Sequence, residues 1–283
     1  MRHGAMRRSD WAWIAGLALV FAPALLSMAR VWLALDYYSH GFLVPIVAWW
    51  IALPRLRRLG PPGRHAGGSF AIATALALYA AGLAFDSVAL QGFAFVGAIA
   101  GIAARLWGSG GLRALALPVA LLLFMVPLPQ TLLGPFILKL QLWVSGVGVE
   151  ILHRAGFSVL REGNVVLLPG GESLFVDEAC SGITSIVTLL PLGVVLGWLS
   201  LRTTSARVLL LIGVVPLAML GNLVRVLATV VAARSYGVER VTSGALHDAA
   251  GLATFVLSCL LLIGLGRVLR RLLPGPPLAR PAT

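Results

Sequence analysis

Cys180 is the residue of this sequence best suited to nucleophilic chemistry, and it lies in the run Asp177-Glu178-Ala179-Cys180-Ser181-Gly182-Ile183. A hydrophobic stretch follows Gly182, so Cys180 is expected beside a helix start, where unpaired backbone N–H groups concentrate positive potential. That potential stabilises a thiolate, which is the reactive form of cysteine. The alternative is a small packing residue, and this is our interpretation of Cys259, which lies in an almost unbroken apolar run.

Arg225 is the charged residue that interrupts the apolar run from Val208 to Val231. A guanidinium near the middle of a membrane costs at least about 2.5 kcal/mol, so its side chain needs a polar partner. Asn222 lies three residues earlier on the same helix face and is a candidate for the same site. The alternative is that Arg225 extends toward the outer membrane surface and keeps its charge in water.

His247 opens the last apolar stretch, at a depth expected to match that of Cys180. An isolated histidine here is a polar end residue, but beside a cysteine it is a candidate base or ion-pair partner. Asp248 points to a neighbouring face and is expected to be a helix-start carboxylate. The sequence therefore predicts that Cys180, Arg225 and His247 converge from three helices.

The elements that position these residues are expected to be membrane-spanning helices. Hydrophobic residues make up 59% of the 283 residues and charged residues 11%, whereas a soluble domain carries about a quarter charged residues. The expected spans are 11–28, 41–53, 69–85, 89–104, 114–126, 182–199, 208–231 and 246–265. The pattern predicts an all-α integral membrane protein with a bundle of about eight transmembrane helices, no cleavable signal peptide, and neither metal nor cofactor.

The basic residues predict the topology. With a cytoplasmic N-terminus, 15 of the 22 basic residues fall in the cytoplasmic segments, as the positive-inside rule requires. They are Arg2, Arg7, Arg8, Arg55, Arg57, Arg58, Arg64, Arg105, Arg113, Arg202, Arg207, Arg267, Arg270, Arg271 and Arg280. Both termini are then cytoplasmic and Cys180 faces outward. The net charge of +12 reflects topology and contact with the lipid bilayer, and a nucleic-acid partner has no support.

The segment between Val126 and Cys180 is expected to lie outside the membrane. Residues 131–156 mix apolar and charged side chains, which predicts an extracytoplasmic amphipathic helix, with a tilted extra span as the alternative. The β-prone runs 164–168 and 173–176 flank a Pro-Gly-Gly-Glu turn signal, which predicts a small β-hairpin. We expect one transmembrane domain over residues 1–273 and a short cytoplasmic Pro-rich tail over 274–283.

Five motifs recur in a recognisable order along the chain. They are Tyr38-Ser39-His40-Gly41-Phe42-Leu43-Val44-Pro45 before Trp49-Trp50, Val126-Pro127-Leu128-Pro129, Ala179-Cys180-Ser181-Gly182-Ile183, Asn222-Leu223-Val224-Arg225, and His247 followed by Gly251. Their order and spacing resemble the exosortase/archaeosortase family over nearly the whole chain. Each motif is weak by itself, but five in order make coincidence a poor explanation.

The resemblance implies a cysteine transpeptidase in the bacterial inner membrane, with its active site facing the periplasm. Its catalytic residues would be Cys180, Arg225 and His247, with His40, Asn222 and Ser181 in substrate-binding or supporting roles. The partners implied are membrane-anchored proteins with a C-terminal PEP-CTERM-type signal. Cys180 would form a thioester with the substrate, and an amine acceptor or water would resolve it. His40 is open to a second interpretation, as an interfacial histidine in an aromatic belt.

Two other functions fit parts of the pattern. A transporter or channel would use Arg225 and His247 to line a polar pathway, but it gives Cys180 no role. A membrane acyltransferase acting on lipid or polysaccharide would also use a site at the membrane surface. A covalent thioester on Cys180 would separate these functions from a transpeptidase.

Overall fold

The computed structural model of the protein describes residues 8–169, 171–176 and 181–275, with side chains from Trp11 onward. The chain forms two compact units, Met1–Leu132 and Leu133–Thr283. The predicted nucleophile Cys180 and nearly all of the predicted Pro-rich tail lie outside the described residues.

Long apolar helices dominate both units. Among the described residues, seven helices are long and apolar enough to cross a membrane, which needs about 20 residues at a rise of about 1.5 Å each. They are α1 (Arg8–Ala34), α3 (Ala66–Ala84), α4 (Val88–Ala114), α6 (Gln130–Arg154), α7 (Ile183–Ser200), α8 (Thr204–Tyr236) and α10 (Gly244–Leu272). The predicted all-α, multi-pass membrane architecture is therefore confirmed.

The expected number of eight spans and the expected interfacial helix are not confirmed. Two of the expected spans correspond to shorter helices: α2 (Leu43–Leu56), and α5 (Ala116–Leu122) with the 3-10 turn η2 (Leu123–Met125). The segment expected as an amphipathic helix is α6, a continuous helix of 25 residues with the length and hydropathy of a span. The charged residues that suggested an interfacial helix are sparse enough along α6 to leave an 18-residue apolar window.

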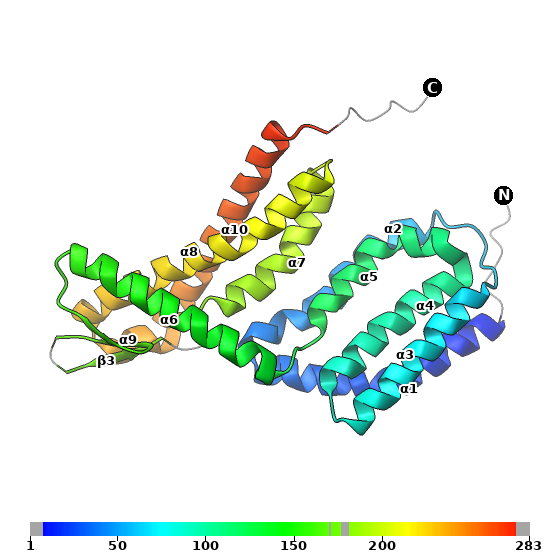
Figure 1. The fold of residues 1–283 in the computed structure, drawn as a ribbon, viewed down its shortest axis with the longest axis horizontal. Helices are drawn as coiled ribbons and strands as arrows, with labels where there is room; N and C mark the ends of the chain where they lie inside the picture. Colours follow the sequence, from blue (N-terminus) through cyan, green and yellow to red (C-terminus); the bar gives the residue numbers. More distant parts are fainter. Residues whose placement is uncertain (1–7, 170, 177–180, 276–283) are drawn as a thin grey trace. The chain divides into compact units, whose positions relative to one another are not determined.

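The first unit is built around the antiparallel pair α3 and α4, with α1 packed against α4 (Figure 1). Its core joins side chains from all three helices: Leu17, Phe21, Ala24, Ile72, Ala75, Tyr79, Ala94 and Ala98. Helices α3 and α4 approach closely at Gly68, where an added Cβ atom would lie 2.1 Å from the backbone nitrogen of Arg105. Only glycine fits at this crossing.

A 3-10 helix, η1 (Asp36–Phe42), connects α1 to α2 and carries part of the first motif. Its hydrogen bonds reach the segment that follows α5: the Tyr38 hydroxyl accepts from the Leu128 backbone N–H at 2.7 Å, and the Tyr37 hydroxyl accepts from the Gln130 side chain. Near the end of α1, the Trp32 indole donates to the Met125 carbonyl at 2.8 Å. The first two motifs of the sequence therefore meet inside one unit.

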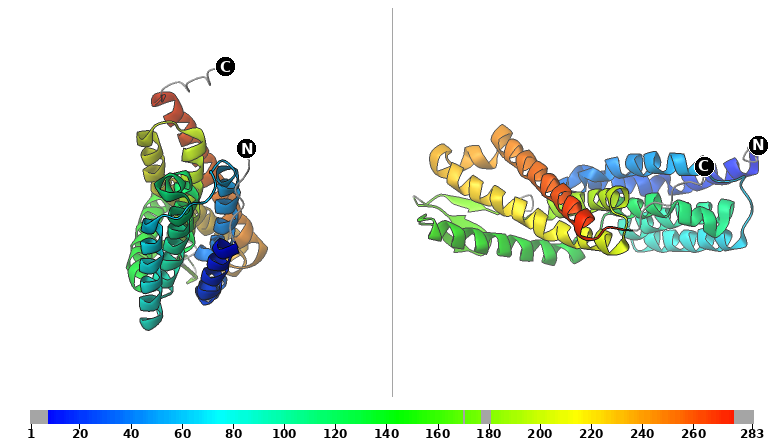
Figure 2. Two further views of the ribbon diagram at one scale, coloured as in Figure 1. Left: turned by 90° about the vertical axis from the view of Figure 1, so that its right-hand side faces the viewer. Right: turned by 90° about the horizontal axis from the view of Figure 1, so that it is seen from above.

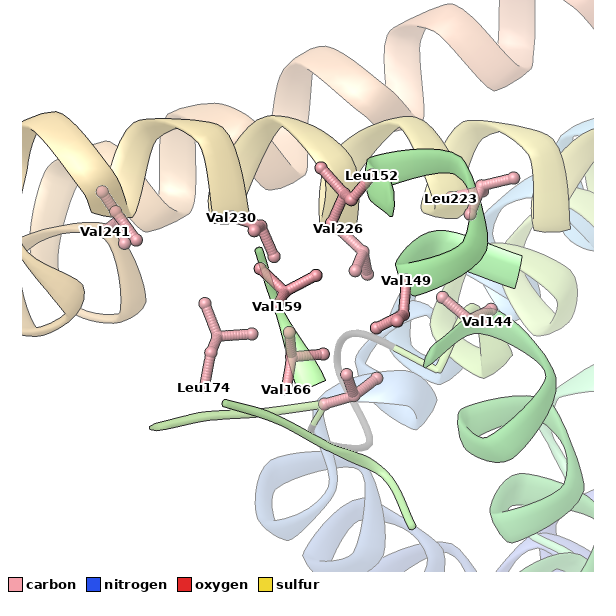
Figure 3. Close-up of a cluster of buried hydrophobic side chains, with 12 residues drawn as sticks. Val144, Val149, Leu152, Val159, Val166, Leu174, Leu223, Val226, Val230 and Val241 are labelled. Carbon is pink, nitrogen blue, oxygen red and sulfur yellow. The ribbon is translucent and has the colours of Figure 1, made fainter. Parts of the chain in front are cut away.

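The second unit contains α7, α8 and α10, with α8 packed against both of the others. In Figure 2, α8 (yellow) and α10 (orange to red) cross, and α6 (green) runs along the other side of α8. Figure 3 shows the core between α6, α8 and a small sheet, to which Val144, Leu152, Val226, Val166 and Leu174 contribute. The sheet is therefore anchored to two long helices by buried aliphatic side chains.

The small sheet has three antiparallel strands, β1 (Leu160–Glu162), β2 (Val165–Leu167) and β3 (Ser173–Phe175), in that order. The predicted hairpin is β2 with β3, and its register pairs Val165 with Phe175. Strand β1 was not predicted. The sequence feature that could have predicted β1 is the two-residue turn that begins at Gly163. Glycine is typical as the first residue of a tight hairpin turn, and Gly163 has a φ of +62°.

We predict that Gly68→Ala destabilises the protein by about 1–3 kcal/mol, because the added methyl group would overlap the backbone of α4. The measurement is the free energy of unfolding in detergent micelles. Gly67→Ala is the matched control, since a Cβ atom at that position meets nothing within 4 Å. Equal unfolding free energies for the two variants would contradict the assigned crossing.

Candidate active site

The candidate site begins with the crossing of α8 and α10. An added Cβ atom at Gly221 would lie 2.1 Å from the Ser258 hydroxyl oxygen and 3.3 Å from the Thr254 carbonyl oxygen. The hydroxyl of Ser258 is fully buried and donates to the Thr254 carbonyl at 2.9 Å, so it is satisfied within its own helix. The absence of a side chain at Gly221 therefore lets the two helices approach closely.

Arg225, one turn further along α8, reaches the first turn of α10. Its Nη2 atom lies 2.8 Å from Nε2 of His247. An arginine guanidinium only donates hydrogen bonds, so Nε2 must accept, and the proton of the neutral imidazole is then on Nδ1. The structure therefore brings two of the three predicted catalytic residues into direct contact.

Gly251 makes room for this contact. It lies one helical turn after His247, and an added Cβ atom there would be 3.4 Å from both Cζ and Nη2 of Arg225. The guanidinium group consequently lies along the surface of α10, in reach of the His247 ring. This contact gives a physical reason for the spacing of the last motif.

The start of α7 lies against the same part of α8. Gly182, the residue before α7, has a φ of +88°, and an added Cβ atom would lie 3.3 Å from Cβ of Asn222. Asn222 and Ser181 are both buried, and the Ser181 hydroxyl oxygen accepts from the Ile183 backbone N–H at 3.2 Å. The start of α7 thus lies against Asn222, one turn from Arg225.

Cys180 itself is not among the described residues, but the chain on either side of it is anchored. Val176 is fully buried, its N–H donates to the Asn164 carbonyl at 2.9 Å, and its carbonyl accepts from the Asn164 amide at 3.3 Å. On the other side, Ser181 is buried at the start of α7. The two anchored residues are therefore only five positions apart in the sequence.

His40 belongs to the first unit and lies in η1. A carbonyl oxygen only accepts, so Nε2 of His40 donates to the Phe124 carbonyl at 3.1 Å. Burial lowers the pKa of His40, and the hydrogen bond to Phe124 acts in the opposite direction. In this structure His40 joins η1 to η2, a contact that was not predicted from the sequence.

A family model described as transmembrane exosortase matches residues 32–264. This range covers most of the chain and includes every predicted site residue. The chain belongs to the transmembrane exosortase family. No curated protein and no solved structure matches the chain. Membership of this exosortase family supports a membrane-embedded protease or transpeptidase role on sorting-signal substrates.

Gly182 and Gly221 position parts of this site in the exosortase, and neither role was predicted from the sequence. Each glycine is adjacent to a polar residue that it serves, Ser181 and Asn222 respectively, and that adjacency was the available signal. The close approaches that they permit depend on how the helices cross, which periodicity does not encode.

We predict that Arg225→Gln raises the rate at which diethyl pyrocarbonate modifies His247 at neutral pH. The reagent attacks an unprotonated ring nitrogen, and Arg225 occupies that nitrogen in the exosortase structure. A hydrogen bond to a charged group is worth about 1.5–3 kcal/mol, so the expected increase is about tenfold or more. Peptide mass spectrometry measures the rate.

The control is Arg234→Gln, which removes an exposed arginine from the same helix. It should leave the rate at His247 unchanged, and the exposed His65 should react equally in all three proteins. An unchanged rate at His247 in Arg225→Gln would contradict the assigned hydrogen bond.

Proposed function

We propose that this exosortase is a cysteine transpeptidase that cleaves C-terminal PEP-CTERM-type sorting signals of exported proteins at the outer face of the inner membrane. The observation that carries the proposal is the hydrogen bond between Arg225 and His247, next to the helix start that follows Cys180. Family membership supports the reaction class, and the site supplies a base and a donor for it.

In the first step, the Cys180 thiol loses its proton to His247 and the sulfur attacks the carbonyl carbon of the scissile bond. The tetrahedral intermediate then collapses, the C–N bond breaks, and the leaving amine takes the proton from His247. The product of this half-reaction is a thioester on Cys180. An amine acceptor, or water, attacks the thioester in the second half and restores the thiol.

Arg225 has two tasks in this scheme. In the resting site it occupies the Nε2 lone pair of His247, so His247 can accept a proton there only when that donor turns elsewhere. The carbonyl oxygen of a bound substrate is an alternative acceptor, and it becomes a stronger one as negative charge develops on it. When Arg225 turns from His247 to the substrate carbonyl, it would therefore leave Nε2 of His247 able to accept a proton. The same movement would let Arg225 stabilise the oxyanion.

Asn222 and Ser181 are proposed to support the site. Asn222 lies between the start of α7 and Arg225, so its buried side chain maintains the spacing between the nucleophile segment and the guanidinium. Ser181 accepts the N–H of Ile183 at the first turn of α7. This bond helps to fix the backbone directly after Cys180.

The proposed orientation rests on the positions of arginines in the second unit. Arg202 and Arg207 lie at the α7–α8 connection, and Arg267, Arg270 and Arg271 lie at the end of α10. The Arg225–His247 pair belongs to the opposite ends of α8 and α10. Under the positive-inside rule, the pair then faces the periplasm and the C-terminal end of α10 faces the cytoplasm. The N-terminus is proposed to be cytoplasmic because of the arginines near it, Arg2, Arg7 and Arg8.

We predict that Cys180→Ala abolishes processing of a PEP-CTERM-type substrate in reconstituted membranes, while the protein remains folded. Arg225→Lys should lower the rate by on the order of 10²-fold or more, because lysine keeps the charge but lacks the planar donor fork. His247→Ala should remove activity as well. The measurement is conversion of the substrate on a gel.

Cys259→Ala is the control, because Cys259 lies in the apolar part of α10 and should be dispensable. If Cys180→Ala processed substrate at the wild-type rate, the covalent mechanism would be wrong. A wild-type rate in Arg225→Lys would instead show that position 225 needs only a positive charge and not the planar donor fork of arginine.

The substrate is expected to need its own membrane anchor, because the proposed site lies at the ends of spanning helices. Deleting the hydrophobic helix of the signal, but not the recognition motif, should abolish processing. Replacing that helix with a polyleucine helix of equal length should restore it. Efficient processing of the soluble form would contradict the proposed placement of the reaction at the membrane surface.

A further inference from the structure

The first unit has a strongly basic end that the proposed reaction does not use. The end of α2, the start of α3 and the end of α4 meet there, at the right of Figure 1. These elements and their loops carry Arg55, Arg57, Arg58, Arg64, Arg105 and Arg113. The charge at this end of the unit is therefore concentrated in a few short segments.

Acidic residues are almost absent from this end. The sequence has no Asp or Glu between Asp36 and Asp86 or between Asp86 and Glu150. Asp36 follows α1 and Asp86 connects α3 to α4, so both lie at the other end of these helices. Asp10 is the acidic position in the first turn of α1, and it follows Arg7 and Arg8.

The connection between α2 and α3 is held firmly against α4. The backbone N–H of Gly63 donates to the Leu106 carbonyl at 2.7 Å, and that of His65 donates to the Arg105 carbonyl at 3.0 Å. The Trp107 indole donates to the Gly60 carbonyl at 2.9 Å. These bonds fix the backbone that presents Arg57, Arg58 and Arg64, so a ligand need not order the loop.

The depth of this surface is marked by two tryptophans. The guanidinium of Arg105 lies 5.9 Å from the centre of the Trp13 ring and donates to the Ser69 hydroxyl. Trp107 is half-buried beside the loop. Tryptophan rings concentrate at the headgroup level of membranes, so the neighbouring arginines are at the depth of lipid phosphates.

We propose that the exposed arginines Arg57, Arg58 and Arg64, with Arg105, form an arginine platform that binds the phosphate headgroups of anionic phospholipids. Guanidinium groups match the geometry of a phosphate diester and donate to two of its oxygens at once. The fixed loop, the two tryptophans and the scarcity of acidic residues favour a lipid headgroup over a soluble anion. The platform holds the first unit at the headgroup layer of the cytoplasmic leaflet.

The test measures binding of phosphatidylglycerol to the full-length protein in detergent by native mass spectrometry. The triple variant Arg57→Gln/Arg58→Gln/Arg64→Gln should bind this lipid on the order of 100-fold more weakly, at about fivefold for each arginine near the membrane surface. Each single variant should show about a fivefold loss, which keeps the test valid if the triple variant does not fold.

The matched control replaces three exposed arginines of the second unit, Arg154→Gln/Arg234→Gln/Arg240→Gln. It removes the same charge and should lose less than fivefold. Phosphatidylcholine should bind the wild type weakly, and inorganic phosphate should not compete with phosphatidylglycerol. Equal losses in the two triple variants would overturn the platform, and competition by inorganic phosphate would overturn the assignment to lipid.

Discussion

The hydrogen bond between Arg225 and His247 is the interaction on which the second unit depends. A guanidinium within a membrane-spanning helix is costly unless a polar group receives it, and the imidazole of His247 on α10 is one such group. Gly221 brings α8 and α10 close enough for the bond, and Gly251 leaves room for the guanidinium. The requirement to pair one charged side chain thus gives a reason for glycine at positions 221 and 251.

The same bond connects structure to chemistry. It orients the imidazole of His247, but it also occupies the nitrogen that a base must use. A site built in this way is held inactive until a second acceptor engages Arg225, and the scissile carbonyl of a bound substrate is such an acceptor. The proposed enzyme would therefore be protected from unproductive ionisation of its thiol between turnovers.

A contact could be predicted from the sequence where a charged side chain is energetically costly in an apolar segment without a partner. Arg225 in an apolar run demanded a partner, and the structure provides His247 as one. The predicted amphipathic character of α6 is not confirmed, because α6 is a continuous helix of 25 residues with the length and hydropathy of a span, the alternative that the sequence left open. Strand β1 and the bonds between η1 and Leu128 were missed, since such contacts depend on tertiary packing rather than periodicity. The roles of Cys180 and the facing of the site stay predictions.

The covalent mechanism is tested most directly by intact-mass spectrometry of the enzyme after reaction with a membrane-anchored substrate. The reaction is quenched in acid, which preserves thioesters. The covalent mechanism predicts a mass increase equal to the mass of the N-terminal substrate fragment. Peptide mapping should locate this adduct on Cys180, and hydroxylamine should remove it. The same mechanism also predicts that the adduct is absent from His247→Ala and present in Cys259→Ala. Two results would contradict the covalent mechanism. One is product formation by Cys180→Ala without any adduct, and the other is an adduct on a residue other than Cys180.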